Sequence, residues 1–186
     1  MKAIVRSSDK FQVRILRPVE WEQLRDSMDT DTKKICTSLL ITGMRYAELQ
    51  RFRENPNWLD GKFIFLPKGS MLKVKAKQQE RNIRLSDMGK TIIGDLFTAP
   101  HPLPSLPTLD MKLRRLSTKI LEDAAVNNKT FRKTWESWLV FYYPDKSLQI
   151  ARSQGHTTIT QYEYYLDMPF TDEDRRDMRK WVDGWI

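Results

Sequence analysis

Hydrophobic residues in the first part of the chain recur at helical spacing. Three segments show this pattern, at about 19–28, 32–42 and 44–53. Just before the second segment, Asp29-Thr30-Asp31 form a cluster of typical helix-capping residues. Gly43 interrupts the pattern between the second and third segments, so we expect two helices joined by a sharp turn there.

The pattern then changes from helical spacing to short extended runs. Residues 58–66 place Asp60-Gly61 between two apolar runs, which is a hairpin signal. Residues 71–77 alternate between apolar and basic side chains, and residues 81–85 supply a partner strand. The sequence therefore predicts a small antiparallel sheet of about three strands.

Helical spacing returns after Ser86, which is expected to cap a helix that runs to about residue 97. Residues 98–108 contain four prolines and predict an exposed loop. Further helices are predicted at about 109–126, 129–142, 146–153, 158–166 and 172–185. Thr171 and the acidic residues after it mark the start of the last one. Residues 1–17 are interpreted as an extended lead-in or linker, and residues 18–186 as one mainly α domain with a small three-stranded sheet (α+β).

The charge balance suggests a phosphate-rich partner. Lysine and arginine number 32 against 24 aspartates and glutamates, which gives a net charge of +8 over 186 residues. DNA or RNA would select such an excess, although a basic protein with no nucleic-acid role is the alternative. One cysteine excludes an internal disulfide, and two histidines are too few for a histidine-based metal cluster. No stretch approaches the ~20 apolar residues of a membrane helix, so we expect an intracellular protein outside the membrane.

Three short motifs carry chemistry. The first is Thr42-Gly43-Met44-Arg45-Tyr46-Ala47-Glu48-Leu49, in which an arginine and a glutamate lie three residues apart on one helical face. The second is Lys129-Thr130-Phe131-Arg132, with two cations on one turn. The third is Gln154-Gly155-His156, followed nine residues later by Tyr165. Taken singly, each motif has an ordinary structural reading: a helix start with an ion pair, a basic helix face, or a packed histidine and tyrosine.

Together, in this order, the motifs resemble the catalytic boxes of the tyrosine recombinase (phage integrase) family over about residues 20–170. Lys129 stands where the family usually has histidine, a departure associated with archaeal and archaeal-virus members. The resemblance implies the tyrosine recombinase catalytic-domain fold for 18–186, including a C-terminal helix at 171–186. It also implies cleavage and rejoining of DNA through a 3′-phosphotyrosyl intermediate, without metal, ATP or a small-molecule cofactor.

The resemblance also assigns roles to residues. Tyr165 would be the nucleophile rather than Tyr162 or Tyr164. The remaining catalytic residues would be Arg45, Lys75, Lys129, Arg132 and His156, with Glu48 orienting the arginines. Lys75 is the general acid chosen from a strand face that also holds Lys73 and Lys77. DNA-backbone contacts are expected from Lys68, Arg81 and Arg84.

The expected partner is double-stranded DNA with specific attachment sites, bound by a tetramer. The expected setting is the cytoplasm of a host cell, for a prokaryotic, viral or mobile-element protein that integrates a genome. The alternatives are a type IB topoisomerase-like enzyme and a catalytically impaired DNA-binding relative. A metal-dependent nuclease ranks third. Family members carry an N-terminal DNA-binding domain that seventeen residues cannot form, so the chain is expected to be a fragment or a minimal catalytic unit.

Overall fold

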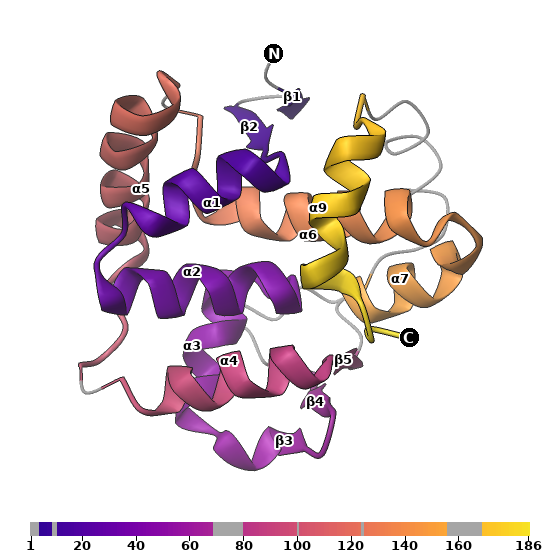
Figure 1. The fold of residues 1–186 in the computed structure, drawn as a ribbon. Helices are drawn as coiled ribbons and strands as arrows, with labels where there is room; N and C mark the ends of the chain where they lie inside the picture. The colour runs from indigo at the N-terminus through magenta and orange to yellow at the C-terminus, as the bar shows by residue number, and fades with distance from the viewer. Residues whose placement is uncertain (1–3, 9–10, 69–79, 100, 124, 156–168) are drawn as a thin grey trace.

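The protein is described by a computed structural model that covers residues 4–8, 11–68, 80–99, 101–123, 125–155 and 169–186. It is mainly helical and has a three-stranded antiparallel sheet, which confirms the predicted class (Figure 1). The helices are α1 Pro18–Asp26, α2 Thr30–Thr42, α3 Tyr46–Glu54, α4 Asp87–Phe97, α5 Leu106–Leu121, α6 Asn128–Tyr142, α7 Ser147–Gln154 and α9 Asp172–Val182. Single 3₁₀ turns lie at Pro56–Trp58 and Pro144–Lys146.

Helix α2 lies at the centre of the molecule. It packs against α1, α4 and α6, while α9 packs against α1 and α6. Nine of its thirteen residues are buried, so the helix is covered on nearly every side. The predicted apolar face of α2 was therefore only part of the surface that the fold buries.

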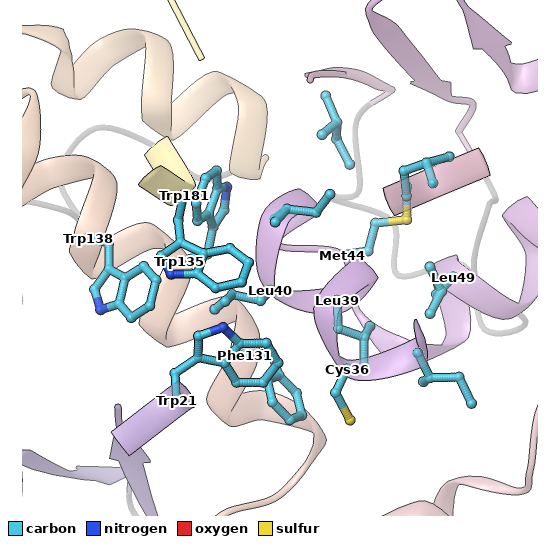
Figure 2. Packing of buried hydrophobic residues seen from close by; sticks show 14 of the residues in the cluster. Trp21, Cys36, Leu39, Leu40, Met44, Leu49, Phe131, Trp135, Trp138 and Trp181 are labelled. Atoms are coloured by element: carbon cyan, nitrogen blue, oxygen red, sulfur yellow. The ribbon is translucent and has the colours of Figure 1, made fainter. Parts of the chain in front are cut away.

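Large aromatic side chains fill the core between α1, α6 and α9. The ring of Trp21 meets Phe131 and Trp181 edge to face, each with ring centroids 5.9 Å apart. Figure 2 shows these rings gathered with Trp135 and Trp138. Aromatic pairs in this arrangement are favourable beyond the area that they bury. The cluster holds the first, sixth and last helices together.

Local signals set the helix ends much as the sequence predicted. The Asp29 side chain accepts a hydrogen bond from the Thr32 N–H at the start of α2, and Ser86 caps α4 in the same way through Gly89. Gly43 ends α2 in the left-handed region, at φ 61°. Glycine adopts this conformation without the steric cost that a Cβ imposes, so the chain can turn sharply into α3.

The small sheet consists of β3 Leu59–Asp60, β4 Phe63–Leu66 and β5 Arg81–Arg84, in the order β3-β4-β5. The hairpin predicted around Asp60-Gly61 is confirmed. The strand predicted at 81–85 is also present, but the partner that the structure shows for it is β4, with Ile64 opposite Ile83. The partner expected for it, residues 71–77, lies outside the described residues. The long-range pairing with β4 was not visible in the local pattern.

The extended lead-in is bound to the helical body. Strand β1 Ile4–Ser8 pairs with β2 Phe11–Ile15, and β2 packs against α6. The Leu16 N–H donates to Thr134 Oγ1 at 3.0 Å, and the indole N–H of Trp138 donates to the Leu16 carbonyl at 2.9 Å. Residues 11–17 are therefore continuous with the folded body rather than a separate linker.

Both ends of α5 and the end of α9 differ from the prediction by three or more residues, since α9 ends at Val182 rather than near 185, and one predicted helix is not described. The proline-rich loop ends at Ser105, whose side chain caps α5, and Pro107 lies in the first turn of that helix. Proline is compatible with a first turn because its missing N–H would have no helical partner there. Helix α5 also ends at Leu121 rather than near 126. The helix predicted at 158–166 lies outside the described residues.

The C-terminal helix is docked on its own chain. Thr171 caps α9 as predicted, through the Asp174 N–H. Its apolar residues Met178, Trp181 and Val182 are buried, as is Trp185 beyond the end of the helix. A buried ion pair joins Arg17 to Asp174, and Arg17 Nη2 donates to the Pro169 carbonyl at 2.7 Å. These contacts join the start of α1 to the start of α9.

Candidate active site

The first motif forms the turn between α2 and α3. Arg45 is the N-cap residue of α3, and its N–H donates to Glu48 Oε2 at 2.8 Å. Its guanidinium reaches the other carboxylate oxygen, with Nη1 3.0 Å from Oε1. The side chain of Arg45 is 38% exposed, whereas that of Glu48 is fully buried. Arg45 therefore lies at the surface, and the buried carboxylate of Glu48 fixes its position.

A second arginine holds the same carboxylate. Arg81 donates from Nη1 to Glu48 Oε1 at 2.9 Å and from Nη2 to Oε2 at 2.7 Å. Such a two-point pair fixes the guanidinium plane. We expected Arg81 to contact DNA at the surface, but it lies buried in this pair. The period-two pattern of β5 contained a signal for this, because Arg81 and Ile83 share the buried face while Asn82 and Arg84 are exposed.

Neighbouring groups stabilise the ionised form of Glu48. Burial by itself raises the pKa of Glu48, but the opposing effects of Arg81, Arg132 and the Arg45 N–H outweigh it. The pKa is therefore held below the ordinary value of 4.5, and the group is a carboxylate at neutral pH.

The third arginine connects parts of all three motifs. Arg132 comes from α6 and is buried. Its Nη1 donates to the Gly43 carbonyl at 2.7 Å, and its Nη2 donates to the carbonyl of Gln154. One guanidinium of the second motif thus bonds to the glycine of the first and to the glutamine of the third.

Burial leaves Arg132 in a strongly positive environment. Desolvation, followed by the charges of Arg81 and Arg45, lowers its pKa from 12.5 to about 9. Glu48 and the buried Glu136 act in the opposite direction. The three arginines exceed these two carboxylates by one positive charge. An anion bound beside the cluster would offset the repulsion among the arginines and so raise the pKa of Arg132.

Two glycines leave room for this arrangement. A Cβ at Gly43 would collide with the side-chain amide of Gln154. Gly155 ends α7 at φ 67°, and a Cβ there would lie 3.1 Å from Arg81 Cδ and 3.3 Å from its Nη1. Both positions combine a left-handed backbone with close approach of a site residue. Glycine is needed at each of them on both grounds.

The remaining site residues fall into three groups. Lys129 lies one turn before Arg132 at the start of α6, where its N–H donates to Asn127 Oδ1 at 2.9 Å. Lys68 and Arg84 are exposed, as a DNA-contact role requires. The other predicted residues lie outside the described part of the chain: Lys73, Lys75, Lys77, His156, Tyr162, Tyr164 and Tyr165.

Within the described residues, no group of three or more histidine, cysteine or acidic side chains could hold a metal ion. No helix among them has the length and apolar character needed to cross a membrane. No known protein family matches the chain, and no curated protein is significantly similar to it.

Proposed function

We propose that this chain breaks and rejoins DNA strands as a tyrosine recombinase (integrase) and that its helical body is the catalytic domain of that family. One observation carries the proposal. The guanidinium of Arg132 bonds to Gly43 and Gln154, so the described parts of three motifs far apart in sequence meet at one place. A surplus positive charge at that place suits a phosphodiester.

The chemistry follows from what phosphoryl transfer needs. Tyr165 loses its phenolic proton to solvent and attacks the scissile phosphorus as a phenolate, forming a Tyr–O–P bond as the bond to the 5′-oxygen breaks. Arg45 and Arg132 stabilise the charge on the non-bridging oxygens, and His156 and Lys129 add hydrogen-bond donors. Lys75 gives a proton to the departing 5′-oxygen. Rejoining is the reverse reaction with another 5′-hydroxyl, and it needs no ATP because the covalent link retains the bond energy.

Glu48 and Arg81 act as positioning residues in this scheme. The carboxylate of Glu48 holds Arg45 from one side and Arg81 from the other, at 2.7 to 3.0 Å. Charges that are already in place do not have to reorganise during the reaction. This preorganisation is the main source of rate enhancement in sites that stabilise a charged transition state.

The proposal extends to the assembly and its setting. The substrate is double-stranded DNA with specific attachment sites, and strand exchange requires four protomers on two duplexes. The protein would act in the cytoplasm of a host cell, where it integrates a viral or other mobile genome. The net charge of +8 supports DNA as the partner.

A DNA-binding relative that does not cleave is the second candidate. The observation in its favour is that both terminal nitrogens of Arg132 donate to main-chain carbonyls, which is also how a purely structural arginine would be held. In that case Arg132 would brace the fold and the cluster would bind DNA without transferring phosphate.

Trapping on a nicked suicide DNA substrate separates the two candidates. The wild-type protein should form a covalent 3′-phosphotyrosyl adduct that maps to Tyr165, and Tyr165→Phe should bind DNA without forming it. Arg45→Ala should reduce cleavage about 10²–10³-fold, the usual loss for one charge-stabilising donor. Arg51→Ala is the matched control, because Arg51 lies on the same helix in a surface pair with Glu54. Specific DNA binding with no adduct would support the second candidate and reject the first.

A further inference from the structure

The outer face of the small sheet carries two exposed aromatic rings. Strand β4 alternates, with Ile64 and Leu66 buried and Phe63 and Phe65 at 47% and 42% exposure. Single exposed apolar side chains are ordinary on protein surfaces. Two aromatic side chains at alternate positions expose more apolar surface on one strand face, which makes that face a candidate binding surface.

Polar side chains lie on the same face in register with both rings. Asp60 is opposite Phe63 on one side and Arg84 is opposite it on the other, while Asn82 is opposite Phe65. All three polar residues are exposed. Opposite residues in an antiparallel sheet have Cβ atoms about 4.5–5.5 Å apart, so each ring has a hydrogen-bonding group within reach.

This combination matches an unpaired nucleobase better than another protein. A base offers a flat π face to a phenyl ring and a polar edge to neighbouring groups, and guanidinium, amide and carboxylate groups are the ones that bind base edges. An apolar protein surface laid on the same face would bury Arg84 and Asp60 without compensation. Two residues of a strand rise about 6.7 Å, which is twice the ~3.4 Å spacing of stacked bases, so positions 63 and 65 are spaced to admit one base between their rings.

The face is also close to the arginine cluster in the fold. Arg81 and Asn82 are neighbours on β5, and their side chains point to opposite faces of the sheet. Arg81 holds Glu48 on the inner face, so the aromatic face lies on the other side of the same strand.

We propose that Phe63 and Phe65, flanked by Arg84, Asn82 and Asp60, form a stacking platform for unpaired DNA bases. This rests on the proposed function in one respect: exchange of a cleaved strand unpairs the bases beside the cleaved phosphate, and the platform would hold them. The recognition is by stacking, so it tolerates different base sequences.

The test compares a fluorescent single-stranded oligonucleotide with a fully paired duplex in binding titrations with the whole chain. Phe63→Leu/Phe65→Leu keeps the apolar surface and removes the π faces. Single-strand affinity should fall about tenfold per ring, or about 100-fold in the double variant, while duplex affinity changes less than about twofold. Leu148→Ala is the matched control, since Leu148 is a 50% exposed apolar residue on α7, and it should change neither affinity.

Three results would overturn the platform. The first is that the Phe63→Leu/Phe65→Leu variant binds the single strand as tightly as wild type does. The second is that this variant loses affinity equally for duplex and single strand. The third is that the wild-type protein is a dimer, that the leucine variant is still a dimer, and that Phe63→Ala/Phe65→Ala is a monomer. The last would identify a second copy of the chain as the occupant. These binding measurements test the platform alone, whereas formation of the covalent adduct tests the proposed function. Phenylalanine-dependent single-strand binding without any adduct would keep the platform and reject the recombinase.

Discussion

Replacing Glu48 with glutamine is expected to destabilise the fold severely, because one buried carboxylate serves three partners. It accepts hydrogen bonds from the guanidinium of Arg81, from the guanidinium of Arg45 and from the Arg45 N–H. Glutamine has nearly the same size, but it lacks the charge and offers one acceptor oxygen instead of two. Arg81 and Arg132 would then be buried beside an uncharged neighbour.

The magnitude follows from the burial of both partners. The side chain of Glu48 is 0% exposed and that of Arg81 is 3% exposed. Removing one partner of a buried ion pair costs about 3–5 kcal/mol, because the other charge is left uncompensated. Losing the bond to the Arg45 N–H contributes part of a capping effect of about 0.5–2 kcal/mol. The two losses share one carboxylate and do not add, so we expect a total of about 3–5 kcal/mol.

Urea unfolding at several pH values measures this cost. The folded-state pKa of Glu48 lies below its ordinary value of 4.5, so its charge stabilises the fold fully above that pH. The contribution is lost as pH falls through the lower folded-state pKa. The difference between wild type and Glu48→Gln should therefore be largest near pH 7 and should shrink below about pH 4.5.

Glu54→Gln provides the control for charge removal on the same helix. Glu54 is 64% exposed and forms a surface pair with Arg51, so its loss should cost less than about 1 kcal/mol. A cost for Glu48→Gln below about 1 kcal/mol, or one that stays constant down to pH 3, would refute the reasoning about this cluster.

Three further outcomes are expected. Millimolar sulfate or vanadate should raise the melting temperature against chloride of equal ionic strength, because the arginine cluster carries a surplus positive charge; no gain at pH 7 would reject an anion site. Gly155→Ala should cost about 1–3 kcal/mol, because its φ is 67°, whereas Gly94→Ala in α4, where a Cβ meets nothing within 4 Å, should not destabilise. Cleavage lost in Lys75→Ala should return with a 5′-bridging phosphorothiolate, because sulfur leaves without a proton; rescue of Lys73→Ala or Lys77→Ala instead would move the general acid to that lysine.

The parts of the fold that the sequence predicted are those decided locally. A cap residue such as Ser86 or Thr171 acts on an N–H only three residues away, so the pattern contains both partners. The Asp60-Gly61 turn is equally local, since it joins two adjacent strands. Such elements can be placed without knowledge of the rest of the chain.

The sequence could not predict contacts between residues that are far apart in the chain, because only the complete fold brings them together. Arg81 is one of many basic residues in its segment, and its pairing with Glu48 spans 33 positions. The anchoring of Leu16 to Trp138 spans 122 positions and uses a main-chain carbonyl, which has no sequence signature. The order of the three motifs is visible in the sequence, but the hydrogen bonds from Arg132 to the carbonyls of Gly43 and Gln154 arise only in the folded chain.

The tryptophans of the core also provide an intrinsic fluorescence signal for the position of α9. Trp181 on α9 lies against Trp21 on α1, with ring centroids 5.9 Å apart, and neither side chain is more than 5% exposed. Buried indoles emit at shorter wavelength than indoles in water. Release of the C-terminal helix would expose Trp181, Trp185 and the facing surface of Trp21 together, shifting the emission to the red. Undocking of this helix can therefore be followed in real time without a label.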